Sequence, residues 1–192
     1  MSHFCELGCG VVGVGWMGER HARVWSEIPF TSLRAVYDID RERAEQVASR
    51  YGCDVAESLD DLVGRDDVQI VSICTPDNLH VEPSVAAAKA RKHLLIEKPL
   101  ATTVPDAKAI IDAVRESGVV AMVGHIVRFD ARYWMAREQV RAGALGDLIY
   151  AYARRYNIID SAERIAPRST VSFFLGIHDV DAIRWITGRR IV

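Results

Sequence analysis

The chain has 192 residues, of which 49% are hydrophobic and 26% are charged, a composition typical of a globular protein. This length allows one complete core and part of a second, at about 100 to 200 residues per domain. The formal net charge is −2 and no basic run stands out, so neither nucleic acid nor an anionic membrane surface is a favoured partner.

The sequence also lacks the marks of a membrane or metal-binding protein. No apolar stretch approaches the roughly 20 residues that a membrane-spanning helix needs. The first apolar segment has no basic region before it, which argues against a secretory signal. The cysteines Cys5, Cys9, Cys53 and Cys74 are scattered, without the C-x-x-C spacing of a metal site. We therefore expect reduced thiols, no metal and a cytoplasmic location.

A glycine-rich turn follows the first apolar strand. Gly13, Gly15 and Gly18 have the G-x-G-x-x-G spacing, in which the glycines make the turn, admit a pyrophosphate and let the next helix pack closely. The start of that helix favours an anion. The spacing alone also fits a purely structural turn. The predicted cofactor contacts here are Gly13, Val14, Gly15, Trp16, Met17 and Gly18.

The next elements favour dinucleotide binding over a structural turn. A helix is expected over Glu19–Glu27 and a strand over Leu33–Tyr37, followed by Asp38. Asp38 lies twenty residues after the last glycine, where a Rossmann unit carries the acid that binds the adenosine ribose. Its carboxylate repels a 2′-phosphate, so we expect NAD rather than NADP, although Arg41 and Arg43 lie near enough to weaken that repulsion.

Helices and strands continue to alternate up to Gly124. The expected elements are a helix over 41–51, a strand over 53–55, a short helix capped by Ser58, a strand over 68–74, a helix over 81–90, a strand over 93–96, a helix over 104–117 and a strand over 119–123. This alternation predicts an α/β fold, with a doubly wound, mostly parallel Rossmann sheet over residues 1–124. Ligands bind at the carboxyl edge of such a sheet, where Thr75–Asn78 and Glu97–Pro99 fall.

The pattern changes after Gly124. The expected elements are an amphipathic helix over Phe129–Ala142, a half-buried strand over Asp147–Tyr156, a polar loop over 157–170, a helix over Val171–Thr187 and a strand that begins at Arg189. These elements cannot close a core of their own. We therefore expect residues 125–192 to form the start of a second, α+β domain that is incomplete in this chain.

Four motifs in order make the sequence resemble the Gfo/Idh/MocA oxidoreductases. They are Gly-Val-Gly-Trp-Met-Gly (13 to 18), Thr-Pro-Asp-Asn-Leu-His (75 to 80), Glu-Lys-Pro (97 to 99) and Gly-Ile-His-Asp-Val-Asp-Ala-Ile-Arg-Trp-Ile-Thr-Gly (176 to 188). The resemblance implies a Rossmann domain, followed by a domain with an open, mostly antiparallel sheet for substrate binding and oligomerisation. Members are considerably longer, so it also implies that only the opening of the second domain is present here.

The resemblance implies roles for particular residues. Lys98 would lie beside the nicotinamide and the substrate hydroxyl, and His178 would be the catalytic acid/base. Arg128 would meet the cofactor or an anionic group of the substrate. For Arg128 a plain surface position is an equally good interpretation, and turn chemistry alone also explains Pro76 and Asn78. The further cofactor contacts implied are Thr75, Pro76, Asn78, His80, Glu97 and Lys98.

One position departs from the family pattern. Many members have an aspartate one helical turn before the histidine, whereas this chain has Phe174, which cannot accept a hydrogen bond. Either Phe174 faces a substrate with an apolar surface, or Lys98 carries more of the acid/base chemistry, or activity is low.

Together these features predict an NAD(P)-dependent oxidoreductase that acts on a hydroxyl of a sugar, polyol or related small molecule. Two alternatives stay open: an NAD-dependent glycoside hydrolase that releases sugar without net NADH, and a nucleotide-binding module without turnover. Because an unpaired strand edge seeks a partner, we expect a homo-oligomer that forms through the strand over Asp147–Tyr156.

Overall fold

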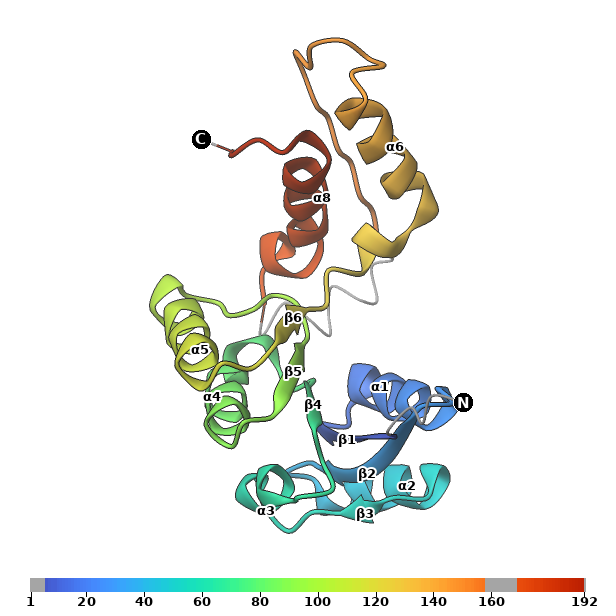
Figure 1. Ribbon diagram of the computed structural model, residues 1–192, viewed down its shortest axis with the longest axis vertical. Helices are drawn as coiled ribbons and strands as arrows, with labels where there is room; N and C mark the ends of the chain where they lie inside the picture. The colour runs from blue at the N-terminus through green and yellow to red at the C-terminus, as the bar shows by residue number, and fades with distance from the viewer. Residues whose placement is uncertain (1–5, 158–168, 192) are drawn as a thin grey trace. The chain divides into compact units, whose positions relative to one another are not determined.

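The computed structural model describes residues 6–157 and 169–191 (Figure 1). Cys5, Val192 and most of the predicted loop over 157–170 therefore lie outside the described residues. The chain divides into two compact units, Met1–Gly124 and His125–Val192, which we describe one at a time. In the described part of the chain, no helix has the length and apolar character that crossing a bilayer requires.

The first unit is built on a six-stranded, all-parallel sheet with the order β3-β2-β1-β4-β5-β6 (Figure 1). Its strands are β1 (Leu7–Val12), β2 (Thr31–Tyr37), β3 (Asp54–Val55), β4 (Ile70–Ile73), β5 (His93–Ile96) and β6 (Ala121–Val123). The strand order reverses between β1 and β4, and ligands bind at such a switch point in open parallel sheets. The predicted doubly wound Rossmann sheet is confirmed.

Helices cover both faces of this sheet (Figure 1). They are α1 (Trp16–Glu27), α2 (Arg41–Tyr51), α3 (Leu59–Gly64), α4 (Val81–Lys89) and α5 (Val104–Ser117). Successive strand residues point to opposite faces, so Val11 packs with α1 and α2, whereas Val12 packs with α3, α4 and α5. The predicted cap of α3 is confirmed, because the Ser58 hydroxyl accepts the backbone N–H of Asp61.

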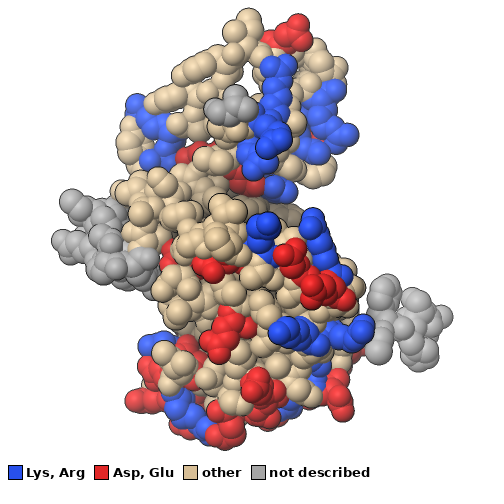
Figure 2. Space-filling model, turned by 90° about the vertical axis from the view of Figure 1, so that its left-hand side faces the viewer, with Lys and Arg blue, Asp and Glu red and all other residues tan. Residues whose placement is uncertain are grey.

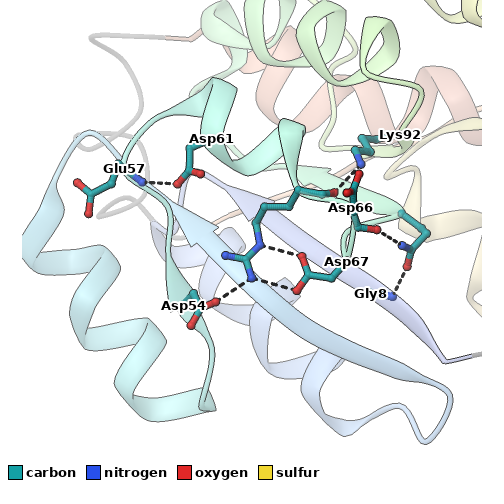
Figure 3. Close-up of polar contacts among 9 residues, drawn as sticks. Gly8, Asp54, Glu57, Asp61, Asp66, Asp67 and Lys92 are labelled. Atoms are coloured by element: carbon teal, nitrogen blue, oxygen red, sulfur yellow. Dashed lines mark hydrogen bonds and ion pairs between the residues drawn. The ribbon is translucent and has the colours of Figure 1, made fainter.

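Ion pairs hold together the amino-terminal edge of the sheet (Figure 3). The Arg65 guanidinium donates to Asp67 at 2.9 Å and to Asp54 at 2.8 Å, and its carbonyl accepts the Lys92 ammonium at 2.7 Å. The hydrogen bond from Arg65 holds the pKa of Asp67 below its ordinary value. Acidic and basic side chains also lie interspersed over the face drawn in Figure 2. The carboxyl edge, at the other ends of the strands, carries the candidate site.

The described part of the second unit is helical. It contains the short 3₁₀ helix η2 (Ile126–Phe129), α6 (Ala131–Arg141), a π-helical turn (Ser172–Gly176) and α8 (Ile177–Thr187). The predicted helix over 129–142 is interrupted at Asp130, whose carboxylate accepts the Arg132 N–H as an N-cap. α6 and α8 meet through the rings of Trp134 and Trp185, whose centroids lie 5.9 Å apart.

The predicted strand over Asp147–Tyr156 is wrong in this structure. These residues have no regular secondary structure, and Ile149 and Tyr150 are 96% and 79% exposed. Alternation of apolar and polar residues gives a strand one apolar and one polar face. A strand also needs a neighbouring strand to which its backbone N–H and C=O groups can hydrogen-bond. Among the described residues none pairs with this segment. Residues 189–191 likewise form no strand.

Candidate active site

The glycine turn joins β1 to α1 at the switch point. Gly13 has φ +81°, and a Cβ there would lie 2.8 Å from the Thr75 nitrogen. A Cβ at Gly18 would lie 1.8 Å from the Gly13 oxygen. A Cβ at Gly15, by contrast, would meet nothing within 4 Å, directly before the first residue of α1. Two glycines therefore permit close packing, and the third borders open space at a helix N-terminus, which suits an anionic group.

Asp38, which follows β2, is hydrogen-bonded to the backbone of the glycine turn. Its Oδ2 accepts the Val14 N–H at 2.8 Å and its Oδ1 accepts the Asp40 N–H at 2.9 Å. The Arg43 guanidinium lies 3.4 Å from Oδ1, whereas Arg41 binds acidic residues elsewhere on the surface. The Arg43 guanidinium reaches both oxygens, at 3.4 and 3.5 Å, so these bonds together use the roughly four lone-pair positions of the carboxylate. The long bonds from Arg43 are the ones that a ribose hydroxyl could replace. Its bond to Val14 is a role that the sequence did not predict.

The loop after β4 is joined to the loop after β5 by a buried histidine. His80 is 1% exposed, with Nδ1 2.8 Å from the Pro99 oxygen and Nε2 3.0 Å from the Thr75 oxygen. Both ring nitrogens thus lie beside backbone carbonyl oxygens, and the predicted contact of His80 with a cofactor stays a prediction. Pro76 and Asn78 are exposed, and their contact with a cofactor stays a prediction.

Glu97 and Lys98 follow the carboxyl end of β5. Glu97 is 7% exposed; its Oε1 lies 3.2 Å from His21 Nε2, and its Oε2 accepts the Lys98 N–H at 3.1 Å. Burial raises the pKa of Glu97, but the hydrogen bonds from His21 and Lys98 and their charges outweigh burial and lower it. Burial lowers the pKa of Lys98, against the opposing charges of Glu97 and Asp77. The site thus pairs an ionised carboxylate with a lysine that loses its proton more easily than usual.

Three residues of this network were missed by the sequence analysis. Ser72 Oγ accepts the Trp25 indole N–H at 2.8 Å and lies 3.1 Å from His21 Nδ1. Two signals were available: Ser72 is a polar residue inside an apolar strand, and His21 and Trp25 are four apart on one helix face. Neither signal indicates that the partner of His21 is a glutamate 76 positions away.

In the second unit, His178 lies at the start of α8, directly after the π-helical turn that contains Phe174. π turns inside helices are frequent at functional sites. Asp181, one turn further on, accepts two bonds from the Arg128 guanidinium, at 2.9 and 2.5 Å. Arg128 therefore already has an anionic partner, and its predicted contact with cofactor or substrate stays a prediction. The described residues contain no cluster of His, Cys, Asp and Glu able to hold a metal.

The family model described as "Oxidoreductase family, NAD-binding Rossmann fold" matches residues 7–125. The chain is 34% identical, over 93% of its length, to an uncharacterized oxidoreductase of Streptococcus pneumoniae, and 33% identical, over 95%, to the 2,7-anhydro-N-acetylneuraminate hydratase of Escherichia coli. It covers 50% of each of these proteins, so it spans about half the length of the curated relatives it matches.

A solved structure has the same fold. The scyllo-inositol dehydrogenase of Lactobacillus casei, solved with bound NAD(H) and scyllo-inositol, superposes with a TM-score of 0.84 at 25% identity. The match covers 96% of this chain and 57% of that one.

Proposed function

Because the chain belongs to the Gfo/Idh/MocA family of oxidoreductases with an NAD-binding Rossmann fold, we propose that it binds NAD at Gly13–Gly18 and forms part of a dehydrogenase. The reaction would transfer hydride between the nicotinamide and a hydroxyl of a sugar, polyol or related small molecule. The open space at Gly15, in front of the N-terminus of α1, carries the proposal. It fits a pyrophosphate, and Asp38 at the end of β2 fits a ribose.

The residues of the chain supply the remaining chemistry. Bound NAD would provide the acceptor for the hydride. The Lys98 ammonium would orient the substrate hydroxyl and stabilise negative charge on its oxygen. His178 would take the hydroxyl proton, because an imidazole titrates near neutral pH. Glu97 would keep an anion beside Lys98, and the glycine turn would align the cofactor.

The proposed substrate is a polyol or sugar, and the proposed location is a reducing cell compartment. The Lactobacillus casei structure with NAD(H) and scyllo-inositol supports a polyol or sugar as the substrate. The free thiols of Cys9, Cys53 and Cys74 support a reducing compartment such as the cytoplasm.

A second candidate function shares the same site. The Escherichia coli relative is named a hydratase, and adding water involves no net oxidation or reduction. A reaction at this site without net NADH formation is therefore the alternative. Mass spectrometry of the product separates the two reactions. A hydratase adds one water to the substrate, about 18 Da, whereas a dehydrogenase removes two hydrogens, about 2 Da.

The glycine turn gives a direct test of cofactor binding. We expect NAD to quench tryptophan fluorescence, because Trp16 opens α1 beside the turn. Gly15→Ala should weaken NAD binding at least tenfold without lowering the melting temperature, because the added Cβ meets no protein atom but occupies the open space. Gly64→Ala, where a Cβ also meets nothing within 4 Å, is the matched control. Equal NAD affinity in the two variants would contradict the proposal.

The same titration tests the preference for NAD. NADP should bind more weakly, because its 2′-phosphate would lie near the Asp38 carboxylate. Arg43 partly offsets that charge, so Arg43→Ala should weaken NADP further and leave NAD unchanged. Asp38→Ala is a poorer test, because it also removes the acceptor of the Val14 N–H. NADP binding as tight as NAD in the wild-type chain would overturn the assignment.

We also propose that the chain self-associates through residues 147–156. Ile149, Tyr150 and Tyr152 are 96%, 79% and 69% exposed, and exposed apolar side chains together favour association. Light scattering should therefore give a mass above the 21.4 kDa of one chain. Ile149→Lys should move the mass toward the monomer. A monomer at high concentration in the wild-type chain would refute this proposal.

A further inference from the structure

A polar network lies between α1 and the sheet, under the candidate active site. It consists of His21 and Trp25 on α1, Ser72 on β4 and Glu97 after β5. Ser72 is fully buried and Glu97 is 7% exposed. Burying polar groups is unfavourable unless each finds a partner, and here the hydroxyl, the imidazole, the indole and the carboxylate bond to one another. The network therefore fixes the position of the His21 ring.

The Glu97 carboxylate joins this network to Lys98. One oxygen lies 3.2 Å from His21 Nε2, and the other accepts the Lys98 backbone N–H at 3.1 Å. His21 lies three residues after Gly18, on the helix that begins at the glycine turn. Two hydrogen bonds thus connect the helix of the predicted cofactor turn to the backbone of the predicted catalytic lysine.

We propose that His21 is a positioning residue of the active site, which through the Glu97 carboxylate fixes the backbone at Lys98 and keeps an anion beside its ammonium. This inference rests on the proposed function, because the position of Lys98 matters to catalysis only if Lys98 acts on substrate. His21 itself bonds to Ser72 and Glu97, two residues of the sheet.

The charged groups around the Lys98 ammonium set its pKa, and His21 acts on that pKa through one of them, Glu97. Among the described residues, the titratable groups that act on Lys98 or lie against Glu97 include Glu97 itself, Asp77 of η1 (Asp77–Leu79), His21 of α1 and Cys74 after β4. Burial and the Glu97 charge raise the pKa of Cys74 well above its ordinary value, so this thiol stays neutral. Burial lowers the pKa of Lys98, and the negative charge of Glu97 opposes this by raising it. The hydrogen bond from His21 stabilises Glu97 in its charged form.

Two substitutions separate the two bonds of His21. In His21→Asn, the short amide keeps a group near the Nδ1 position, facing Ser72, but does not reach Glu97. In His21→Gln, the longer amide places an N–H near the Nε2 position and keeps the bond to Glu97. The pair is matched in polarity, so a difference between them reports the bond to Glu97. Trp25→Phe is a control that leaves both bonds of His21 to Glu97 and Ser72 in place.

The readout is the titration of Lys98, which needs neither turnover nor NAD. Competitive acetylation with acetic anhydride across a pH series, followed by mass spectrometry of the Lys98 peptide, gives the pH at half-maximal labelling. Without the bond from His21, the Glu97 side chain is free to turn away from the Lys98 ammonium, so Lys98 loses the nearby anion that raises its pKa. We expect His21→Asn to move the Lys98 midpoint about one pH unit lower, as Glu97→Gln should, because a charge within 4 to 6 Å acts on this scale. His21→Gln and Trp25→Phe should stay at the wild-type midpoint.

A double-mutant cycle completes the test. In a Glu97→Gln chain, His21→Asn should shift the midpoint no further, because the group through which His21 acts is gone. An unchanged or higher midpoint in folded His21→Asn, or an equal shift in both backgrounds, would overturn the inference. If His21→Asn does not fold, Ser72→Ala removes the second anchor of the ring together with the acceptor of the Trp25 indole N–H. It should give a smaller shift in the same direction, beyond any shift in Trp25→Phe, and no such shift counts against the inference. Failure of NAD to bind would refute the proposed function and leave this titration readable.

Discussion

Replacing Lys98 by alanine should lower kcat about a hundredfold to a thousandfold on a polyol that the wild-type protein oxidises, while NAD affinity changes little. Loss of one electrostatic donor to charge developing on oxygen typically costs roughly 3 to 4 kcal/mol in the transition state. Lys98 follows the carboxyl end of β5, with its backbone held by Glu97, so its position does not depend on its own ammonium. Initial rates at saturating NAD, together with the fluorescence titration, separate the two effects.

The control for this substitution is Lys89→Ala, on the exposed surface of α4, which should leave both kcat and NAD affinity unchanged.

The role of Lys98 also predicts how kcat of the wild-type protein depends on pH. Because burial lowers the pKa of Lys98, the ammonium is lost below the pH at which a surface lysine titrates, and kcat should fall there in the wild type. A variant with normal kcat at saturating NAD and weakened NAD binding would instead mean that Lys98 only supports the loop.

Local chemistry explains why much of the first unit is predictable from sequence. The helix over Val104–Ser117 begins and ends as expected, because Thr103 accepts the Asp106 N–H at one end and Gly118 adopts a left-handed conformation at the other. The apolar run before Cys74 becomes β4 because a strand covered by helices on both faces needs no polar alternation. Such signals depend on neighbours within a few residues.

Other features depend on partners far away in the sequence. His21 and Glu97 are 76 residues apart, and no spacing rule on one helix indicates that pair. The role of Asp38 at Val14 has the same origin, because a carboxylate expected at a ribose also satisfies a backbone N–H of the turn. The strand predicted over residues 147–156 is wrong for a related reason. The alternation of its side chains is a local pattern, but forming a strand requires a second strand to pair with.

His178 is the second residue with a large expected effect, and it lies in the second unit. His178→Ala should lower kcat about a hundredfold to ten-thousandfold, the usual contribution of a general acid or base. The loss should be greatest at neutral pH and smaller at high pH, where the substrate proton leaves more easily. His178→Gln keeps a hydrogen-bonding side chain but cannot accept the proton, so it should be nearly as slow as the alanine variant. Retention of activity in His178→Gln would assign the proton transfer to another group.

Phe174 offers the converse test of the same chemistry. It lies four residues before His178, within the π-helical turn, and a carboxylate there could accept a bond from the imidazole. Phe174→Asp should therefore raise kcat on a polyol if an acceptor for His178 limits turnover. Phe173→Asp is the matched control, because it places the same charge at the neighbouring half-buried aromatic, on a different face of the turn. Equal rates in the two variants, with the fold intact by circular dichroism, would mean that Phe174 does not limit the reaction and would favour its packing against an apolar surface of the substrate.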